Sequence, residues 1–372
     1  MGADFSTSFS PDYAVAPGQH LASVLAVKGM SQAELAVRIG RPQKTVNEIV
    51  KGKAAITPDT ALQLERALGI SAKTWNGLEG NYQLQLAEQR DRARLEEYTH
   101  WVERIPVAEL RKRGHIPETY SKVDLVRRCL EFFGIDSPES LAASSTVAAF
   151  RKSPAFEPDD FAMCTWLRLG ELEAEKTECE PYDRNQFRSQ LDRFRALTRE
   201  SDLQRIKKAL QEESRKCGVA VCFTTELRHT HVSGAARWIS PDKAMIQLSC
   251  RYKSDDHFWF TFFHECAHIL LHGKKEGFLE GRDTSDQEEE EANDFAANHL
   301  IPRQVISSLM RERPLSEERI VRFAEQLGIA PGIVVGQLQK RKRLVQATPL
   351  NKLKRFSFDL AGIKETVAVT SN

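Results

Sequence analysis

The stretch that most constrains the fold of this chain is FWFTFFHECAHILLH, at positions 258 to 272. A helix that is apolar on nearly every face has to be buried in a protein core. This one nevertheless carries His264, Glu265 and His268 at its centre. Burying such groups without partners costs several kcal/mol. The fold must therefore supply a partner for them, and one metal ion can satisfy both imidazoles.

The spacing of these residues is typical of a zinc site. On a helix, His264 and His268 lie one turn apart on the same face, so both imidazoles can reach one Zn²⁺ ion. Glu265 is placed to take a proton from water rather than to bind the ion, which would make it the catalytic base. Cys266 projects to another side of the helix and is expected to be a small core residue.

A third protein ligand is expected, because a catalytic zinc usually has three and keeps one position open. Lys274 stands where the metzincin pattern has its third histidine, so that pattern is excluded. His272 lies too far along the helix axis to join both earlier histidines on one ion. The remaining source is the helix EEEEANDFAANHLIP, in which Glu289 is favoured and Glu290 is the alternative.

The rest of the acidic helix and the nearby strands supply further candidates. Asn293, one turn after Glu289, is expected to hydrogen-bond a ligating histidine. The glutamate run also fits a solvated helix start favoured by the helix dipole, and both interpretations can hold. Peptide hydrolysis needs a donor for the oxyanion; Tyr252, Arg237 and His231 are candidates among which the sequence does not choose.

The segment SQAELAVRIGRPQKTVNEIVKG, residues 31 to 52, has the spacing of a helix-turn-helix. Ser31 and Glu34 form a capping box, and Gly40 permits the turn. The apolar set that packs the two helices is Leu35, Ala36, Ile39, Val46, Ile49 and Val50. The residues expected to contact DNA are Arg41, Gln43, Lys44, Thr45, Asn47, Lys51 and Lys53.

The charge of this segment supports contact with phosphates. Residues 38 to 53 carry an excess of four positive charges in a chain whose net charge is +1. The alternative is a plain helical bundle with a solvated basic edge.

The two motif regions resemble two known families. HECAHILLHG followed by EEEEANDFAANHLIP, within residues 218 to 302, resembles the ImmA/IrrE family of bacterial zinc metallopeptidases. This resemblance implies a zincin core, a Zn²⁺ ion held by His264, His268 and Glu289, Glu265 as general base, and a protein substrate that is usually a repressor.

Residues 17 to 82 resemble the HigA/VapI-type (XRE) antitoxin and regulator family, from PGQHLASVLAVKGMSQAELA through ITPDTALQLERALGISAKTWNGLEGNY. The tryptophan and tyrosine of that family are present as Trp75 and Tyr82. The resemblance implies a homodimer that binds double-stranded operator DNA and commonly represses its own toxin–antitoxin operon.

The expected fold is mainly α with a small α+β part. We expect a helix-turn-helix domain over residues 1–90, a helical connector over 91–215, a zincin-like domain with a short sheet over 216–302, and C-terminal helices over 303–372. In the helix pair of residues 315–343, the run IVVGQL is too apolar for a DNA-reading face, so a structural or partner-docking role is favoured.

Composition excludes several classes of protein. The seven cysteines are scattered without any CxxC pair, which fits reduced thiols rather than a disulfide framework. The first residues do not form a signal peptide, and no apolar run has the length of a membrane span. We therefore expect a cytoplasmic protein without membrane contact.

Two functional hypotheses follow. The first is a transcriptional regulator of antitoxin type whose zinc endopeptidase domain cleaves or binds a protein partner. The alternative is a non-catalytic antitoxin-repressor whose zinc-site domain neutralises a toxin or senses a signal. A weaker third possibility is a domain that keeps the motif without metal.

Overall fold

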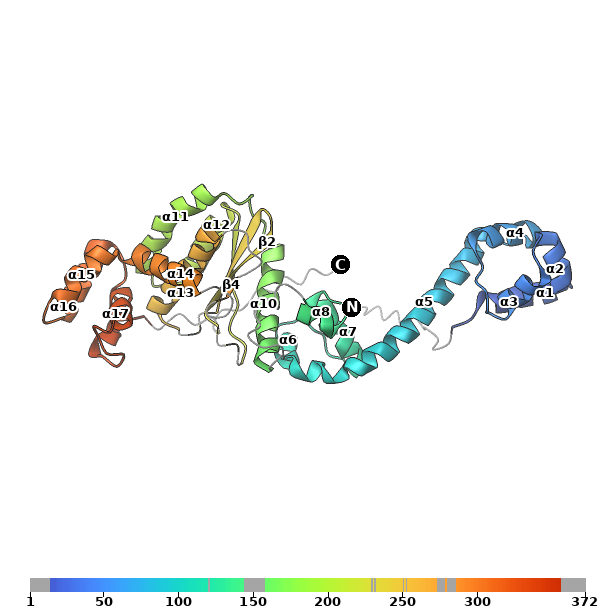
Figure 1. Ribbon diagram of the computed structural model, residues 1–372, viewed down its shortest axis with the longest axis horizontal. Helices are drawn as coiled ribbons and strands as arrows, with labels where there is room; N and C mark the ends of the chain where they lie inside the picture. The colour runs from blue at the N-terminus through green and yellow to red at the C-terminus, as the bar shows by residue number, and fades with distance from the viewer. Residues whose placement is uncertain are drawn as a thin grey trace, which may run out of the picture. The chain divides into compact units, whose positions relative to one another are not determined.

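The computed structural model describes residues 14–119, 121–143, 158–228, 230, 232–249, 251, 253–272, 278–279 and 286–355. The chain divides into two compact units, Met1–Thr99 and His100–Asn372, and each is described by itself. The expected fold class is confirmed, since helices predominate and the strands form one small sheet (Figure 1).

The first unit is all-α. Its helices are α1 (Pro17–Val27), α2 (Gln32–Ile39), α3 (Gln43–Val50), α4 (Pro58–Leu68) and α5 (Ala72–Glu97). The Ser31 hydroxyl accepts a hydrogen bond from the Glu34 backbone N–H at 3.1 Å, as the capping box predicts. Gly40 ends α2 at φ 64°, a left-handed conformation that glycine adopts without strain.

The predicted apolar set forms the core of this unit. Leu35, Ala36, Ile39, Val46 and Ile49 are buried, with Val50 packed against them. The core also requires a small residue where α1 meets the end of α3. A Cβ at Gly18 would lie 1.9 Å from the Ile49 carbonyl oxygen, so only glycine permits this approach.

Helix α5 crosses the domain boundary that was expected at residue 90. It runs for 26 residues, through Gly77 and Gly80 and past the expected boundary at residue 90. A single glycine costs only about 1 kcal/mol in a helix and does not end it unless a left-handed turn follows. The four-part division of the chain stays a prediction.

The second unit holds the sheet and the remaining helices. Before the sheet come η1 (Tyr98–His100), η2 (Val102–Arg104), α6 (Val107–Lys112), α7 (Lys122–Phe133), α8 (Pro138–Ala143), α10 (Pro158–Lys176), α11 (Arg184–Ala196), η3 (Leu197–Arg199) and α12 (Leu203–Arg215). Then follow β1 (Val219–Phe223), β2 (Gly234–Ser240), β3 (Lys243–Leu248), α13 (Asp255–Leu271), β4 (Phe278–Leu279), α14 (Asp286–Leu300), α15 (Arg303–Arg311), α16 (Glu317–Leu327), α17 (Pro331–Lys340) and η4 (Pro349–Leu353).

The sheet has the order β1-β3-β2-β4, with β1 parallel to β3 and the other neighbours antiparallel. Because side chains alternate along a strand, its two faces carry different sets. One face packs with α12 and α13 in the main core, where Val221, Ala236 and Ile246 are buried. Helix α10 covers the other face (Figure 1), where the Gln247 amide donates to the Trp166 carbonyl at 2.7 Å beside Gly170.

The C-terminal helices hold α13 in place. Val334, Val335 and Leu338 of α17 are fully buried in the main core, which confirms a structural role for the IVVGQL segment. The carboxylate of the fully buried Asp255, at the start of α13, accepts hydrogen bonds from the Arg355 backbone N–H and Nε at 3.1 and 3.0 Å. The start of the helix that carries HECAH is therefore anchored by the fold.

We predict that Gly18→Ala destabilises the first unit by about 1–3 kcal/mol, because the added methyl group meets backbone that cannot move away. The matched control is Gly77→Ala, in an exposed part of α5 where a Cβ meets nothing within 4 Å. That change should stabilise the unit by about 1 kcal/mol. Calorimetric unfolding of the intact chain measures both, and equal effects would contradict the assigned contact.

Candidate metal centre and nucleic-acid interface

Helix α13 is buried because its side chains fill the main core from several directions. Phe258, Trp259, Phe262, Phe263 and Cys266 are all at most 4% exposed. Helix α14 lies alongside α13. Bulk water therefore does not solvate the polar residues of HECAH. Their partners must come from the protein or from a bound ion.

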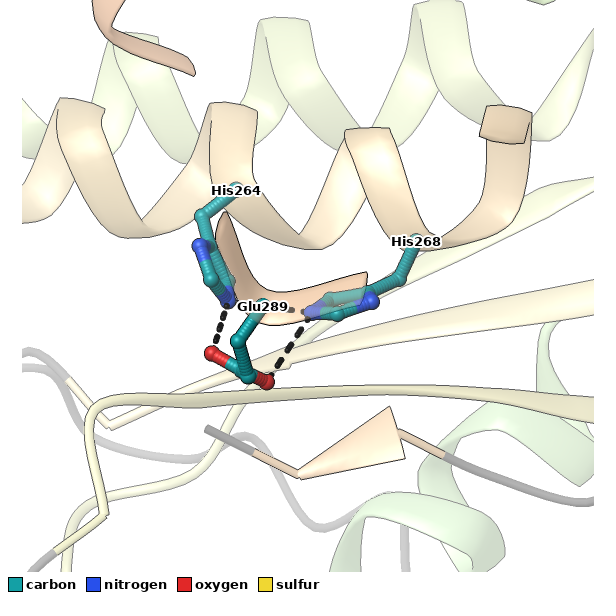
Figure 2. A group of neighbouring side chains, drawn as sticks. All are labelled: His264, His268 and Glu289. Carbon is teal, nitrogen blue, oxygen red and sulfur yellow. Dashed lines mark hydrogen bonds and ion pairs between the residues drawn. The ribbon is translucent and has the colours of Figure 1, made fainter. Parts of the chain in front are cut away.

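Three polar side chains converge at this helix (Figure 2). The Nε2 atoms of His264 and His268 are 3.0 Å apart. The two carboxylate oxygens of Glu289 each lie 3.5 Å from one of these Nε2 atoms. The two histidines come from successive turns of α13 and the glutamate from α14, as expected from the sequence.

The geometry of this group fits a zinc ion. A tetrahedral Zn²⁺ with bonds of about 2.0–2.1 Å keeps its ligand atoms roughly 3.3 Å apart. The three measured separations are 3.0, 3.5 and 3.5 Å. Two imidazoles and one carboxylate are also the donor set of many catalytic zinc sites. The side chains therefore need little rearrangement to hold the ion.

The electrostatics favour the metal-binding form of His264. Burial lowers the pKa of His264 to about 4, and the neighbouring His268 acts in the same direction. Glu289 and the nearby Asn293 amide act in the opposite direction. The His264 imidazole is therefore neutral near pH 7, with a lone pair available for a metal. Asn293 lies near His264, and its expected hydrogen bond to a ligating histidine stays a prediction.

Glu265 lies next to this group but outside it. The metal-ligating group found among the described residues consists of His264, His268 and Glu289 alone. The Glu265 side chain is fully buried and faces strand β2 at Gly234, where a Cβ would lie 2.6 Å from Oε1. The sequence alone did not indicate the contact between Gly234 and Glu265. Single glycines are common at strand starts, and this one belongs to no recognisable motif.

The other candidates have four different outcomes. Glu290 is exposed and does not reach the histidines. Cys266 is a core residue as predicted, and burial raises the pKa of its thiol well above the ordinary value. The prediction of Arg237 as a candidate oxyanion donor was wrong. Arg237 pairs with Glu171 of α10, on the face of the sheet opposite α13. His231 and Tyr252 lie outside the described residues.

A cavity of about 340 Å³ lies between α13, α14 and α17, and none of the three converging side chains lines it. Its lining includes Phe260, whose ring centroid lies 6.2 Å from that of His264, and Asn293. Ile333 and Gln337 of α17 close its other side. The cavity therefore begins about one helical turn from His264 along α13.

In the first unit, α2 and α3 pack against each other as a helix-turn-helix. The predicted contact residues are exposed or half-buried: Arg41, Gln43, Lys44, Thr45, Asn47, Lys51 and Lys53. Arg41 Nε donates to the Gln63 side chain of α4 at 2.9 Å, which fixes its direction. Lys44 forms only a distant ion pair with Glu48, at 3.8 Å, so its ammonium group remains available to a phosphate.

Two families match the chain. Residues 218–338 match the peptidase M78 family, described as the IrrE N-terminal-like domain. Residues 27–75 match a helix-turn-helix family. The first match contains the three converging side chains and continues into α17, and the second contains α2 and α3. Both resemblances seen in the sequence are confirmed.

Individual proteins match the N-terminal part. Virulence-associated protein I of Dichelobacter nodosus is 38% identical over 77 residues, which is 20% of this chain and 71% of that protein. Among solved structures, a HigA-family addiction module antidote protein from Coxiella burnetii is 30% identical and covers 23% of this chain and 92% of its own, with a TM-score of 0.22.

A second solved structure is described as a candidate antidote protein of a plasmid maintenance system from Nostoc punctiforme. It is 29% identical, covers 22% of this chain and 91% of its own, and has a TM-score of 0.22. Separately, none of the helices in the described part of the chain combines the length and apolar character that crossing a membrane requires.

We predict that Glu289→Gln weakens zinc binding at least about tenfold, because an anionic ligand becomes a neutral amide. Glu290→Gln makes the same chemical change one residue away on an exposed side chain and should leave zinc affinity unchanged. Chelator competition measures both affinities. A larger loss in the Glu290 variant would return the ligand role to that residue.

Proposed function

Because this chain belongs to the HigA/VapI-type family of helix-turn-helix regulators and carries an IrrE N-terminal-like domain, we propose that it is a transcriptional regulator of antitoxin type with a zinc-dependent endopeptidase in the same chain. The single observation that carries the enzymatic part is the convergence of His264, His268 and Glu289 beside Glu265.

His264, His268 and Glu289 would hold the ion. When bound there, zinc supplies the Lewis acidity that lowers the pKa of water and polarises a carbonyl group. Three protein ligands leave one position open, which is the feature that separates catalytic from structural zinc sites. No cysteine of the described residues takes part, since the nearby Cys266 is a buried core residue with a protonated thiol.

Glu265 would move the proton in peptide hydrolysis. It follows the first ligand directly and is not one of the three converging groups. In this role it takes a proton from the attacking water and delivers it to the leaving amine. The cavity lined by Phe260 and Asn293, about one helical turn from His264, would give room for a substrate side chain.

The retained glutamate is the argument against a purely non-catalytic domain. A metal site that only stabilises the fold, or only grips a toxin, has no use for a carboxylate buried beside its ligands, where burial is costly. Proteolysis of a protein partner is therefore favoured over toxin neutralisation or signal sensing without cleavage.

The DNA-binding part rests on charge and exposure. Gln43, Lys44, Lys51 and Lys53 are exposed around α3, while Val46 and Ile49 point into the core. Amide and ammonium groups in this arrangement can contact base edges and phosphates in the major groove. The match of residues 27–75 to a helix-turn-helix family supports DNA binding, and we propose that a homodimer binds the operator.

We predict that Glu265→Gln keeps about one zinc per chain, as the wild type does, because Glu265 is not a ligand. The variant should lose the hydrolysis of a fluorogenic peptide library, since its amide cannot accept a proton. Elemental analysis and fluorescence measure the two properties. Loss of zinc in the variant would make Glu265 a ligand, and absence of hydrolysis in the zinc-loaded wild type would favour the non-catalytic alternative.

For the DNA-binding unit, we predict that Lys44→Ala combined with Asn47→Ala abolishes the gel shift of a duplex selected by the wild type from random sequences. The changes remove one phosphate contact and one base contact without touching the core. Zinc content should not change. Lys112→Ala, which removes an exposed lysine of the second unit, is the charge-matched control. Unchanged affinity of the double variant would remove the assignment.

A further inference from the structure

The third histidine of the series HECAHILLH has no role in the metal-ligating group. His272 is the C-cap of α13, and its backbone N–H donates to the carbonyl of His268 at 3.2 Å. Its side chain is only 3% exposed. A buried imidazole at the end of a helix needs hydrogen-bond partners, and the structure provides them on both sides of the ring.

These contacts form a chain that leads away from His268. The Nδ1 atoms of His268 and His272 are 3.3 Å apart. On the far side, Nε2 of His272 lies 3.3 Å from Oε2 of Glu291. Glu291 is held in turn, since Gln287 Nε2 donates to its Oε1 at 3.0 Å.

When His268 binds a metal through Nε2, only one arrangement of protons satisfies all the hydrogen bonds that run from His268 through His272 to Glu291. The proton of its neutral ring must then lie on Nδ1, which donates to Nδ1 of His272. His272 accepts there, so its own proton lies on Nε2 and is donated to the Glu291 carboxylate. Each ring has one donor and one acceptor, and both are used.

We propose that His272 and Glu291 are positioning residues that hold His268 in the tautomer and ring orientation required to bind the metal. The proposal rests on the zinc site of the proposed function. A hydrogen bond from the outer nitrogen of a ligating histidine fixes its tautomer and raises its basicity, and loss of such a partner typically costs about 10–100-fold in metal affinity.

This proposal gives neighbouring members of the acidic run separate roles. Glu289 faces the two metal-ligating histidines, and Glu291 faces His272. Glu290 between them is exposed. If the three glutamates only supplied negative charge to the start of the helix, their substitutions would have similar effects. Because their contacts differ, we expect their substitutions to change zinc affinity by different amounts.

The test is the zinc affinity of the full chain, measured by competition with a chromophoric chelator. His272→Ala should bind zinc about 10-fold or more weakly than the wild type. Glu291→Gln should weaken binding in the same direction but less, because Glu291 is half exposed. Glu290→Gln is the matched control and should not differ from the wild type. His272→Asn keeps an acceptor near the position of Nδ1 and should recover part of the loss.

A second measurement separates positioning from folding. Thermal unfolding of the metal-free variants should match that of the metal-free wild type, while the visible d–d absorption of the cobalt-loaded His272→Ala protein should change in intensity. If His272→Ala binds zinc as tightly as the wild type, or if Glu290→Gln loses as much affinity as Glu291→Gln, the proposal is wrong. A wild type without zinc affinity would overturn the proposed function itself.

Discussion

The candidate metal centre depends on the approach of one glutamate from α14 to two histidines buried in α13. Apolar packing makes α13 a core helix, and this burial makes polar side chains at its centre costly. The fully buried Ala292 and Ala296 of α14 are small enough to let the two helices approach closely. The packing of α13 therefore makes its buried imidazoles energetically costly. The same packing brings the Glu289 carboxylate close to them, and this helps to offset the cost.

The two units have separate cores. The core of the first unit is built by α1 to α5 around Trp75, and the main core of the second by the sheet, α13 and the C-terminal helices. The two units also differ in how far their polar side chains are exposed to water. In the first unit the lysines of α3 and the loop after it are exposed, as contact with phosphates requires. In the second, the chemically important histidines are withdrawn from water.

Local signals in the sequence predicted much of this arrangement, and the errors that concern strand β2 have a common cause. The Ser31 cap, the apolar set around Val46 and the helical spacing of the two histidines are properties of short segments, and each was found as expected. The face on which Arg237 lies was not predictable, because it depends on the pairing of β2 with β3, and a shift of one residue reverses the faces. The closeness of Gly234 to Glu265 depends on the same pairing. Contacts between distant segments were thus predicted correctly only where a sequence motif contained both partners.

The most direct measurement is zinc K-edge X-ray absorption on the zinc-loaded full chain. We expect a first shell of nitrogen and oxygen atoms only, at about 2.0–2.1 Å, with the outer-shell scattering of two imidazole rings. A sulfur atom at about 2.3 Å, or scattering from fewer than two imidazoles, would contradict a site built from His264, His268 and Glu289.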